Sequence, residues 1–170
     1  MAHRSGEFLY MEEKKTYLTP EGRRRLVEEL EYLRDVRRPQ VAEQIKFAKE
    51  GGDVSENAGY DEAKNAQAFL EGRIMTLEQM LRSAVMIGKD GPTDTVQLGA
   101  YVTVQEDGEP RPDTYQIVGS AEANPSEWRI SNESPIGKAM MGRKVGDAFT
   151  VKTPGGERKF KIVKISWIPE

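Results

Sequence analysis

The feature that most constrains the fold of this chain is a stripe of mainly apolar residues that recurs in steps of four and three. The stripe consists of Ala63, Gln67, Leu70, Ile74, Leu77 and Leu81. Such heptad spacing is typical of a helix that packs lengthwise against another helix. The segment therefore predicts a long helix with a helical partner.

The sequence before this stripe supplies the partner. Thr19-Pro20-Glu21 is typical of a helix start, with Thr as N-cap, Pro at the first position and an acid in the first turn. The predicted contact face continues through Leu26, Leu30, Leu33, Arg37, Val41, Ile45 and Ala48. Pro39 lacks a backbone N–H, so we expect it to bend this helix slightly.

A short connection separates the two predicted helices. Gly51-Gly52 ends the first helix, and the second is expected to start near Asp53–Glu56. Because so few residues join them, the helices must run antiparallel. The sequence therefore predicts a coiled-coil hairpin with the tip GGDVSEN.

After Ser83 the periodicity changes to that of β-strands. Five strand-like runs are expected at 96–104, 115–118, 128–130, 149–151 and 160–167. A short helix is expected at Pro135–Met141, ended by Gly142. The predicted fold class is α+β: a hairpin domain at 11–87, a linker at 88–94 and a small, mainly antiparallel β domain at 95–170. Residues 1–10, MAHRSGEFLY, are interpreted as an expression leader.

The composition excludes several kinds of chemistry. The chain has no cysteine, and its one histidine is His3, within the predicted leader. Thiolate catalysis, cysteine zinc sites and an imidazole base in the remaining chain are therefore excluded. No run is apolar and long enough to span a membrane, no secretory signal is present, and we expect a cytoplasmic protein. A net charge of −3 argues against a polycation that wraps nucleic acid.

The two acids of the tip allow two interpretations. Asp53 and Glu56 are three residues apart, close to the spacing of a capping box, and acids are favourable in the first turn of a helix. Alternatively, the pair could help to hold Mg²⁺ where another molecule supplies further oxygen ligands, because two carboxylates are too few alone. The residue chemistry leaves both interpretations open.

Other segments are also ambiguous. The run 134–142 could be a packed helix, with Ile136, Met140 and Met141 supplying apolar contacts, or a binding helix. The arginine runs 23–25 and 37–38 are interpreted as solvated helix faces. Trp128 and Trp167 lie in strand-like runs and are predicted to be core residues.

Four segments resemble the bacterial transcript cleavage factors of the Gre family. They are LTPEG at 18–22, GDVSENAGYDEAK at 52–64, FLEGRI at 69–74 and SPIGKAMMGRKVGD at 134–147. The resemblance covers about residues 14–168, and QAFLEGRI is more similar to the GreA branch than to GreB. It implies an FKBP-like β domain that docks on RNA polymerase and a hairpin that enters the secondary channel of the polymerase.

The resemblance implies an accessory factor rather than an enzyme. Such a factor stimulates the polymerase to cut backtracked nascent RNA near its 3′ end, which rescues arrested complexes. Mg²⁺ would be shared with the polymerase active site and not bound stably by the free protein, which we expect to be a monomer. DNA binding is also expected from the resemblance.

The resemblance also implies roles for individual residues. The positions that match the catalytic and metal-holding tip acids are Asp53 and Glu56; Ser55, Asn57 and Tyr60 would shape the tip, and Lys49 and Lys64 would contact the RNA. The polymerase-docking positions would be Ser134, Pro135, Ile136, Gly137, Lys138, Met140 and Met141.

Two departures from the family pattern concern the tip. Gly59 occupies a position where many members have an acid, and Gly51 precedes the usual Gly52, which should loosen the turn. Two alternative functions follow. One is an inhibitor of the same fold that blocks the channel without cleavage, and the other is a coiled-coil adaptor whose tip acids only cap a helix.

Overall fold

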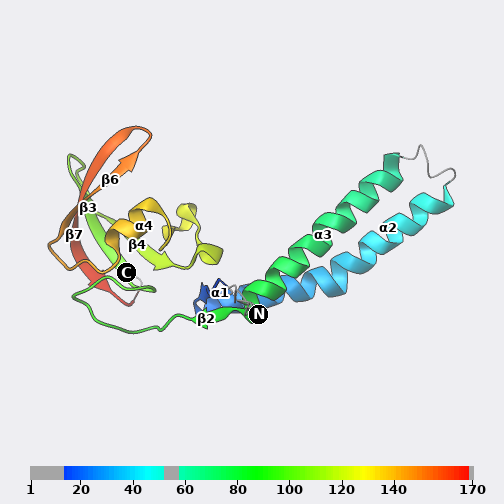
Figure 1. Ribbon diagram of the computed structural model, residues 1–170, viewed down its shortest axis with the longest axis horizontal. Coiled ribbons are helices and arrows are strands. Elements are labelled where there is room, and N and C mark those ends of the chain that lie inside the picture. Colours follow the sequence, from blue (N-terminus) through cyan, green and yellow to red (C-terminus); the bar gives the residue numbers. More distant parts are fainter. Residues whose placement is uncertain (1–13, 52–57, 169–170) are drawn as a thin grey trace, which may run out of the picture.

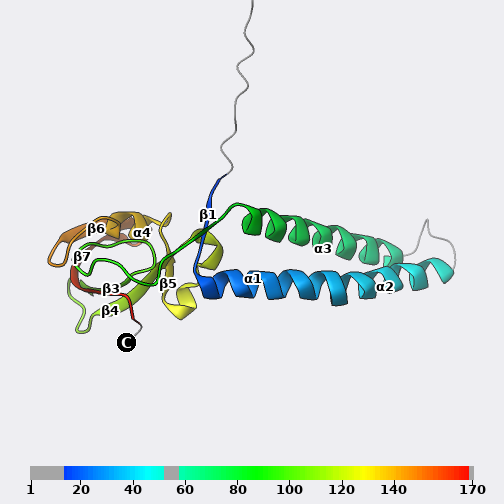
Figure 2. The same ribbon diagram turned by 90° about the horizontal axis from the view of Figure 1, so that it is seen from below.

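The computed structural model describes residues 14–51 and 58–168 of the 170-residue chain. A long helical hairpin extends away from a β domain, and the two meet near the start of the first helix (Figure 1). The view from below shows the same separation, with strand β1 crossing between the hairpin base and the β domain (Figure 2). The predicted α+β fold, a helical hairpin followed by a β domain, is confirmed.

The hairpin consists of two antiparallel helical arms. The first contains α1 (Pro20–Tyr32), a π-helical segment (Leu33–Arg37) and α2 (Arg38–Glu50), and the second is α3 (Ala58–Arg82). Thr19 caps α1 as predicted, because its Oγ1 accepts a hydrogen bond of 3.0 Å from the N–H of Gly22.

The predicted contact face of the hairpin is confirmed. Its buried core consists of Leu18, Leu26, Leu30, Val41, Leu70, Ile74 and Leu77. Arg37 is half-buried on this face, where its aliphatic stem can pack while the guanidinium donates to Gln40. The core therefore runs along the shaft and holds the two arms together over most of their length.

Pro39 distorts the helix by widening it. The backbone N–H of Arg38 donates to the carbonyl of Leu33, five residues earlier, within the π-helical segment. Proline has no N–H to donate, and its ring collides with the carbonyl four residues before it. A π-helical turn immediately before Pro39 accommodates that ring and lets the arm continue to Glu50.

A small parallel sheet closes the base of the hairpin. Strand β1 (Thr16–Leu18) pairs with β2 (Ala84–Met86), and the N–H of Thr16 donates to the carbonyl of Ser83 at 3.0 Å. This sheet is not predicted by the sequence patterns, because two strands of three residues carry almost no periodic signal. Leu18 is fully buried and continues the hairpin core into the base.

The β domain is a five-stranded sheet in the order β5-β4-β3-β7-β6. Its strands are β3 (Tyr101–Glu106), β4 (Asp113–Val118), β5 (Arg129–Ser131), β6 (Ala148–Thr153) and β7 (Gly156–Ser166). All neighbours are antiparallel except β4 and β5, which are parallel. Two 3-10 turns, Ser120–Glu122 and Pro125–Glu127, lie in the crossover between those two strands.

The core of the β domain lies between the sheet and the short helix α4 (Pro135–Met140). Its buried residues include Val102, Val104, Ile117, Met140, Phe149 and Ile162. The run predicted to be a strand from residue 96 forms a regular strand only from Tyr101 onward, because Gly99 has a φ of +98° and turns the chain. Val96 instead exchanges backbone hydrogen bonds with Gly142 and Arg143.

The two tryptophans differ in their surroundings. Trp167 packs against the β-domain core, as predicted, and its indole N–H donates to the carbonyl of Pro92 at 2.9 Å. The prediction that Trp128 is a core residue is wrong, because it is 52% exposed. Trp128 follows a 3-10 turn with a left-handed φ of 59°, which directs the chain into β5 and leaves the ring beside Tyr115.

The packing of the hairpin predicts a contrast between two neighbouring residues of α3. Leu77 is fully buried, whereas Met75 is 67% exposed. We expect Leu77→Ala to lower the free energy of unfolding by about 2–5 kcal/mol, because it leaves a cavity in the seam. Met75→Ala should change it by no more than about 0.5 kcal/mol. Denaturant unfolding followed by helical circular dichroism measures both, and equal losses would contradict the assigned seam.

Candidate functional site

The far end of the hairpin carries the predicted tip. Helix α2 ends at Glu50 with Gly51 as its C-cap, and α3 begins at Ala58 (Figure 1). Asp53, Ser55, Glu56 and Asn57 lie outside the described residues, so their predicted cap and metal-holding roles stay predictions. The described structure does bring the two helix ends that flank them to the end of the hairpin opposite the β domain.

The predicted RNA-contacting and tip-shaping residues that are described occupy these helix ends. Lys49 is exposed in the last turn of α2, and Lys64 is exposed on α3 and donates to Gln67 at 2.6 Å. Tyr60 is half-buried in the first turn of α3. The two ammonium groups therefore lie on the helices on either side of the tip segment.

A hollow of about 580 Å³ lies between the helices next to the tip. It exists because the facing side chains are small, including Ala48, Ala63 and Ala66. Phe47 borders the hollow and is 78% exposed. This hollow is not among the features predicted above, although a phenylalanine that lies off the heptad face is a sequence signal for an exposed apolar site.

Ion pairs tie the two helical arms together along the outside of the seam. Arg73 donates to both carboxylate oxygens of Glu29 at 2.7 and 2.8 Å. Arg38 donates to both oxygens of Glu71 at 2.8 and 2.7 Å. Bidentate ion pairs of this kind constrain geometry as well as charge. They therefore help to fix the orientation of the two arms, which the apolar core between them holds together. Arg34 and Glu78 form a third pair.

These contacts shift the pKa values of the paired groups. The hydrogen bond from Arg38 lowers the pKa of Glu71, and the same bond raises the pKa of Arg38. The hydrogen bond to Glu29 raises the pKa of Arg73. Glu71 and Arg73 both belong to the FLEGRI segment, which in this chain therefore links the arms of the hairpin.

The arginine runs are charged helix faces, as interpreted from the sequence. Arg24 lies 3.7 Å from Glu28, and Arg25 lies 3.9 Å from Glu21, each one helical turn apart. Arg38 is held by Glu71 across the hairpin. Carboxylates thus neutralise much of the positive charge of both runs.

Helix α4 has the features of a packed helix on its inner side, and it leaves residues exposed on its outer side as a binding helix would. The Oγ of Ser134 accepts from the N–H of Gly137 at 3.1 Å and donates to the carbonyl of Ser131 at 2.7 Å. Met140 is fully buried. These residues shape and anchor the helix, as a packed helix requires.

The outer side of α4 remains accessible. Pro135 and Lys138 are exposed, and Ile136 and Met141 are half-buried against the core. A hollow of about 540 Å³ adjoins the start of the helix and is lined by apolar side chains that include Ile136, Tyr115, Val151 and Phe160. The hollow therefore offers an apolar surface at the start of α4, bordered by the charged residues Lys152 and Arg158.

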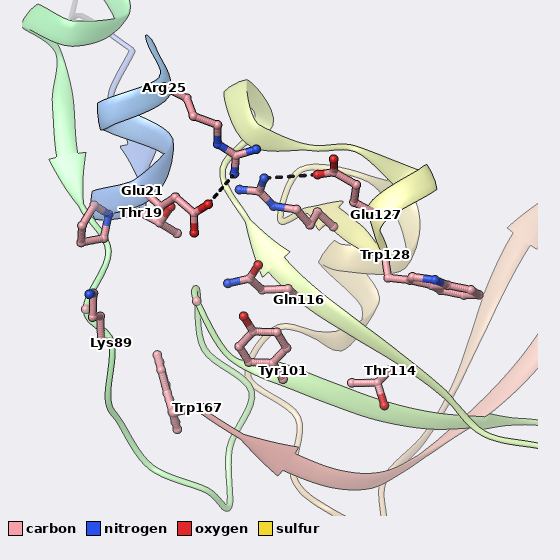
Figure 3. Close-up of a pocket in the computed structure, with 14 residues that line it drawn as sticks. Thr19, Glu21, Arg25, Lys89, Tyr101, Thr114, Gln116, Glu127, Trp128 and Trp167 are labelled. Carbon is pink, nitrogen blue, oxygen red and sulfur yellow. Dashed lines mark ion pairs between the residues drawn. The ribbon is translucent and has the colours of Figure 1, made fainter. Parts of the chain in front are cut away.

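A third hollow, of about 620 Å³, lies where the hairpin base faces the β domain (Figure 3). Arg25 and Glu21 reach it from α1, and Tyr101 and Gln116 reach it from the sheet. Burial raises the pKa of the Tyr101 hydroxyl. The hollow marks the boundary along which the two parts of the molecule meet.

Comparison with known proteins matches both parts of the chain. The family described as "Transcription elongation factor, N-terminal" matches residues 16–86, and "Transcription elongation factor, GreA/GreB, C-term" matches residues 91–167. The transcription elongation factor GreA of Bacillus subtilis is 52% identical over 155 residues, which cover 91% of this chain and 99% of that protein. GreA of Geobacillus kaustophilus is 53% identical over 154 residues, 90% of this chain and 98% of that protein.

The chain belongs to the GreA/GreB family of transcription elongation factors. Among solved structures it is similar to the GreA factor homolog 1 (Gfh1) of Thermus thermophilus. That protein is 33% identical, and the match covers 90% of this chain and 99% of that chain with a TM-score of 0.42.

Membership of this family makes the chain an accessory transcription factor and not an enzyme. The expected DNA binding is not supported, since the matched families and relatives are described only by transcription elongation. Within residues 14–51 and 58–168, no three acidic or histidine side chains are grouped to hold a metal ion. Over the same described ranges, no helix has the length and apolar character needed to cross a membrane.

The ion pair between the arms predicts a pH-dependent stability. The pKa of Glu71 is lowered in the folded hairpin, so the charged carboxylate stabilises the folded state. This stabilisation is fully present at pH values above the ordinary pKa of a glutamate, and it is lost as the pH falls through the lowered pKa. We expect Glu71→Gln to have a lower Tm than the unmodified chain at neutral pH, and the two Tm values to converge at an acid pH below the lowered pKa of Glu71.

Thermal unfolding at both pH values tests this prediction. Glu43→Gln, which makes the same change at an exposed position of α2, serves as the matched control and should leave the Tm unchanged. A Tm difference for Glu71→Gln that is as large at acid pH as at neutral pH would contradict the assigned pair.

Proposed function

We propose that this elongation factor binds RNA polymerase, inserts its hairpin into the secondary channel and stimulates the polymerase to cleave backtracked nascent RNA. The observation that carries the proposal is that the two helix ends on either side of the D-x-x-E segment in the sequence, Gly51 and Ala58, lie at the end of the hairpin farthest from the β domain. The first arm contains 13, 5 and 13 residues in its three segments, so it reaches roughly 45 Å. A hairpin that is long and only two helices wide has a shape that can enter the secondary channel of the polymerase.

Asp53 and Glu56 are the residues that would act at the polymerase active site. Their two carboxylates offer oxygen ligands, which Mg²⁺ prefers, but they supply fewer than the six that it takes. The donor set therefore fits a metal shared with the polymerase and not one held by the free factor. A Mg²⁺ held there would lower the pKa of a bound water and stabilise charge on the phosphodiester.

Other residues of the tip region would position the RNA and the acids. Lys49 and Lys64 are exposed on the two helices that flank the tip, where their charges can attract RNA phosphates. Tyr60, half-buried in the first turn of α3, would support the segment that contains Ser55 and Asn57.

The β domain would supply the affinity for the polymerase. Ser134, Gly137 and Met140 would act indirectly by shaping α4. Pro135 and Lys138 are exposed, and Ile136 and Met141 add half-buried apolar surface beside them. In this proposal residues 11–87 form the inserting domain, 88–94 the linker and 95–170 the docking domain, and one copy acts on one polymerase.

The tip mechanism predicts that Asp53→Ala/Glu56→Ala abolishes stimulated cleavage and leaves polymerase affinity within about threefold. The reason is that the acids act on the reaction and the β domain supplies the binding. The measurement uses stalled, backtracked complexes with end-labelled RNA, alongside a binding titration. Asp61→Ala/Glu62→Ala removes the same charge from exposed positions of α3 and should retain cleavage.

The other outcomes of this experiment separate the alternative functions. Equal loss of binding and cleavage in the tip variant would refute the division of roles. No cleavage with the unmodified chain, together with competition for the channel, would identify an inhibitor. No effect on the polymerase at all would leave Asp53 and Glu56 as caps of a structural hairpin.

The docking role of α4 predicts that Lys138→Glu weakens polymerase binding about tenfold or more, because it reverses a charge at the centre of the proposed contact. Cleavage at saturating factor should be unchanged, since the tip is intact. Lys161→Glu, an exposed position on β7, is the matched control. Unchanged affinity of the α4 variant would contradict docking through this side.

A further inference from the structure

Glu122 is a buried carboxylate at the junction of the two parts of the molecule. It is 7% exposed, in the 3-10 turn after β4. Its Oε2 accepts from the backbone N–H of Thr19 at 2.6 Å, and its Oε1 accepts from the Thr19 hydroxyl at 2.7 Å. Arg129 donates to the same Oε1 at 2.5 Å. We call Glu122, Thr19 and Arg129 the junction clamp.

The junction clamp connects the two parts directly. Thr19 is the N-cap of α1 in the hairpin, whereas Glu122 and Arg129 belong to the β domain. A carboxylate at a helix N-terminus is favourable because it accepts from free N–H groups and meets the positive end of the helix dipole. Here the β domain provides that carboxylate to the first helix of the hairpin.

Close packing surrounds the junction clamp. A Cβ added to Gly22 would lie 1.9 Å from Glu122 Oε1, and one added to Gly119 would lie 2.1 Å from the carbonyl oxygen of Tyr17. Ala121 packs on the hairpin core, and Lys14 pairs with Glu133 at 3.0 Å on the outer side. The backbones of the two parts therefore approach each other as closely as glycine allows.

Several features make this arrangement hard to change. Glu122 and Arg129 are both buried in the β domain, and their ion pair holds the carboxylate in place to face Thr19. Turning the hairpin would remove the acceptor from the N–H and hydroxyl of Thr19. The N–H and the hydroxyl of Thr19 can both donate to the two oxygens of Glu122 in only one arrangement of the hairpin and the β domain.

The length of the hairpin magnifies any motion at this junction. The first arm extends roughly 45 Å from Pro20 to Glu50. A rotation of about 10° at its base would therefore displace the far end by about 8 Å. A misplacement of only about 1 Å can cost on the order of a hundredfold in rate when reacting groups must be aligned.

We propose that Glu122, Thr19 and Arg129 are positioning residues, which fix the direction of the hairpin relative to the β domain and thereby place the tip acids in the polymerase active site. The inference rests on the proposed function. It adds that efficient cleavage depends on a polar contact at the end of the hairpin opposite the reaction.

Gly22→Ala tests the proposal without removing any functional side chain. The new methyl group displaces the Glu122 carboxylate, while alanine favours the helix over glycine. Gly72→Ala is the matched control, because it makes the same change inside α3, where an added Cβ meets no heavy atom of the described residues within 4 Å. Only the first variant should disturb the junction clamp.

The direction of the hairpin can be measured without polymerase. The chain has no cysteine, so spin labels at Glu43→Cys on α2 and Lys159→Cys on β7 report one distance between the two parts. We expect a narrow distance distribution in the otherwise unmodified chain and in Gly72→Ala. In Gly22→Ala the distribution should shift or become at least about twofold wider.

The cleavage rate of backtracked complexes then measures how the direction of the hairpin affects the reaction. At saturating factor, Gly22→Ala should lower the cleavage rate by about tenfold or more, with polymerase affinity within about threefold of the unmodified chain. Thr19→Val, which deletes the hydroxyl donor at similar size, should lower the cleavage rate in the same way. Thr19→Ser keeps the hydroxyl and should have the cleavage rate of the unmodified chain. Circular dichroism should show full helix content in all variants.

Two results would overturn the proposal. An unchanged distance distribution in Gly22→Ala would show that the junction clamp does not set the direction of the hairpin. A changed distribution with a normal cleavage rate would show that the direction does not limit the reaction. If the unmodified chain stimulates no cleavage, the proposed function fails, and with it the catalytic consequence, while the distance measurement still tests the junction clamp.

Discussion

The carboxylate of Glu122 accepts hydrogen bonds from both parts of the molecule, and in our proposal the direction of the hairpin depends on this contact. It caps the first helix of the hairpin through Thr19 and neutralises Arg129 at the start of β5. Because the group is buried, its hydrogen bonds are matched in one arrangement only. A rod attached at one end needs such a junction if its far end is to reach a defined place.

The remainder of the hairpin is built for stiffness. A continuous apolar core holds the two arms together, and two-pronged ion pairs such as Arg38–Glu71 and Arg73–Glu29 link them on the outside. The π-helical turn before Pro39 preserves the first arm across a residue that would otherwise interrupt it. These features hold the helix ends that flank the tip segment far from the β domain, and so keep the proposed docking surface of α4 separate from the proposed chemistry.

Much of this architecture could be predicted from the sequence, because heptad spacing and helix caps are local signals. The seam from Leu26 to Leu77, the Thr19 cap and most strands follow from such patterns. The parallel pairs β1–β2 and β4–β5 could not be predicted, since short strands are paired by tertiary contacts. Trp128 was misassigned because its exposure depends on one left-handed residue. The role of Glu122 was equally hidden, since its partner Thr19 is 103 positions away.

The central claim is that the tip acids complete a metal site owned by the polymerase, and the dependence of cleavage on Mg²⁺ tests it most directly. The measurement is the cleavage rate of backtracked complexes over a Mg²⁺ titration, with the unmodified chain or with Asp53→Ala/Glu56→Ala. The account predicts a lower half-saturating Mg²⁺ concentration with the unmodified chain than with the tip variant. The same half-saturating concentration for both, with a faster rate for the unmodified chain, would contradict it, because the acids would then act without contributing to metal binding.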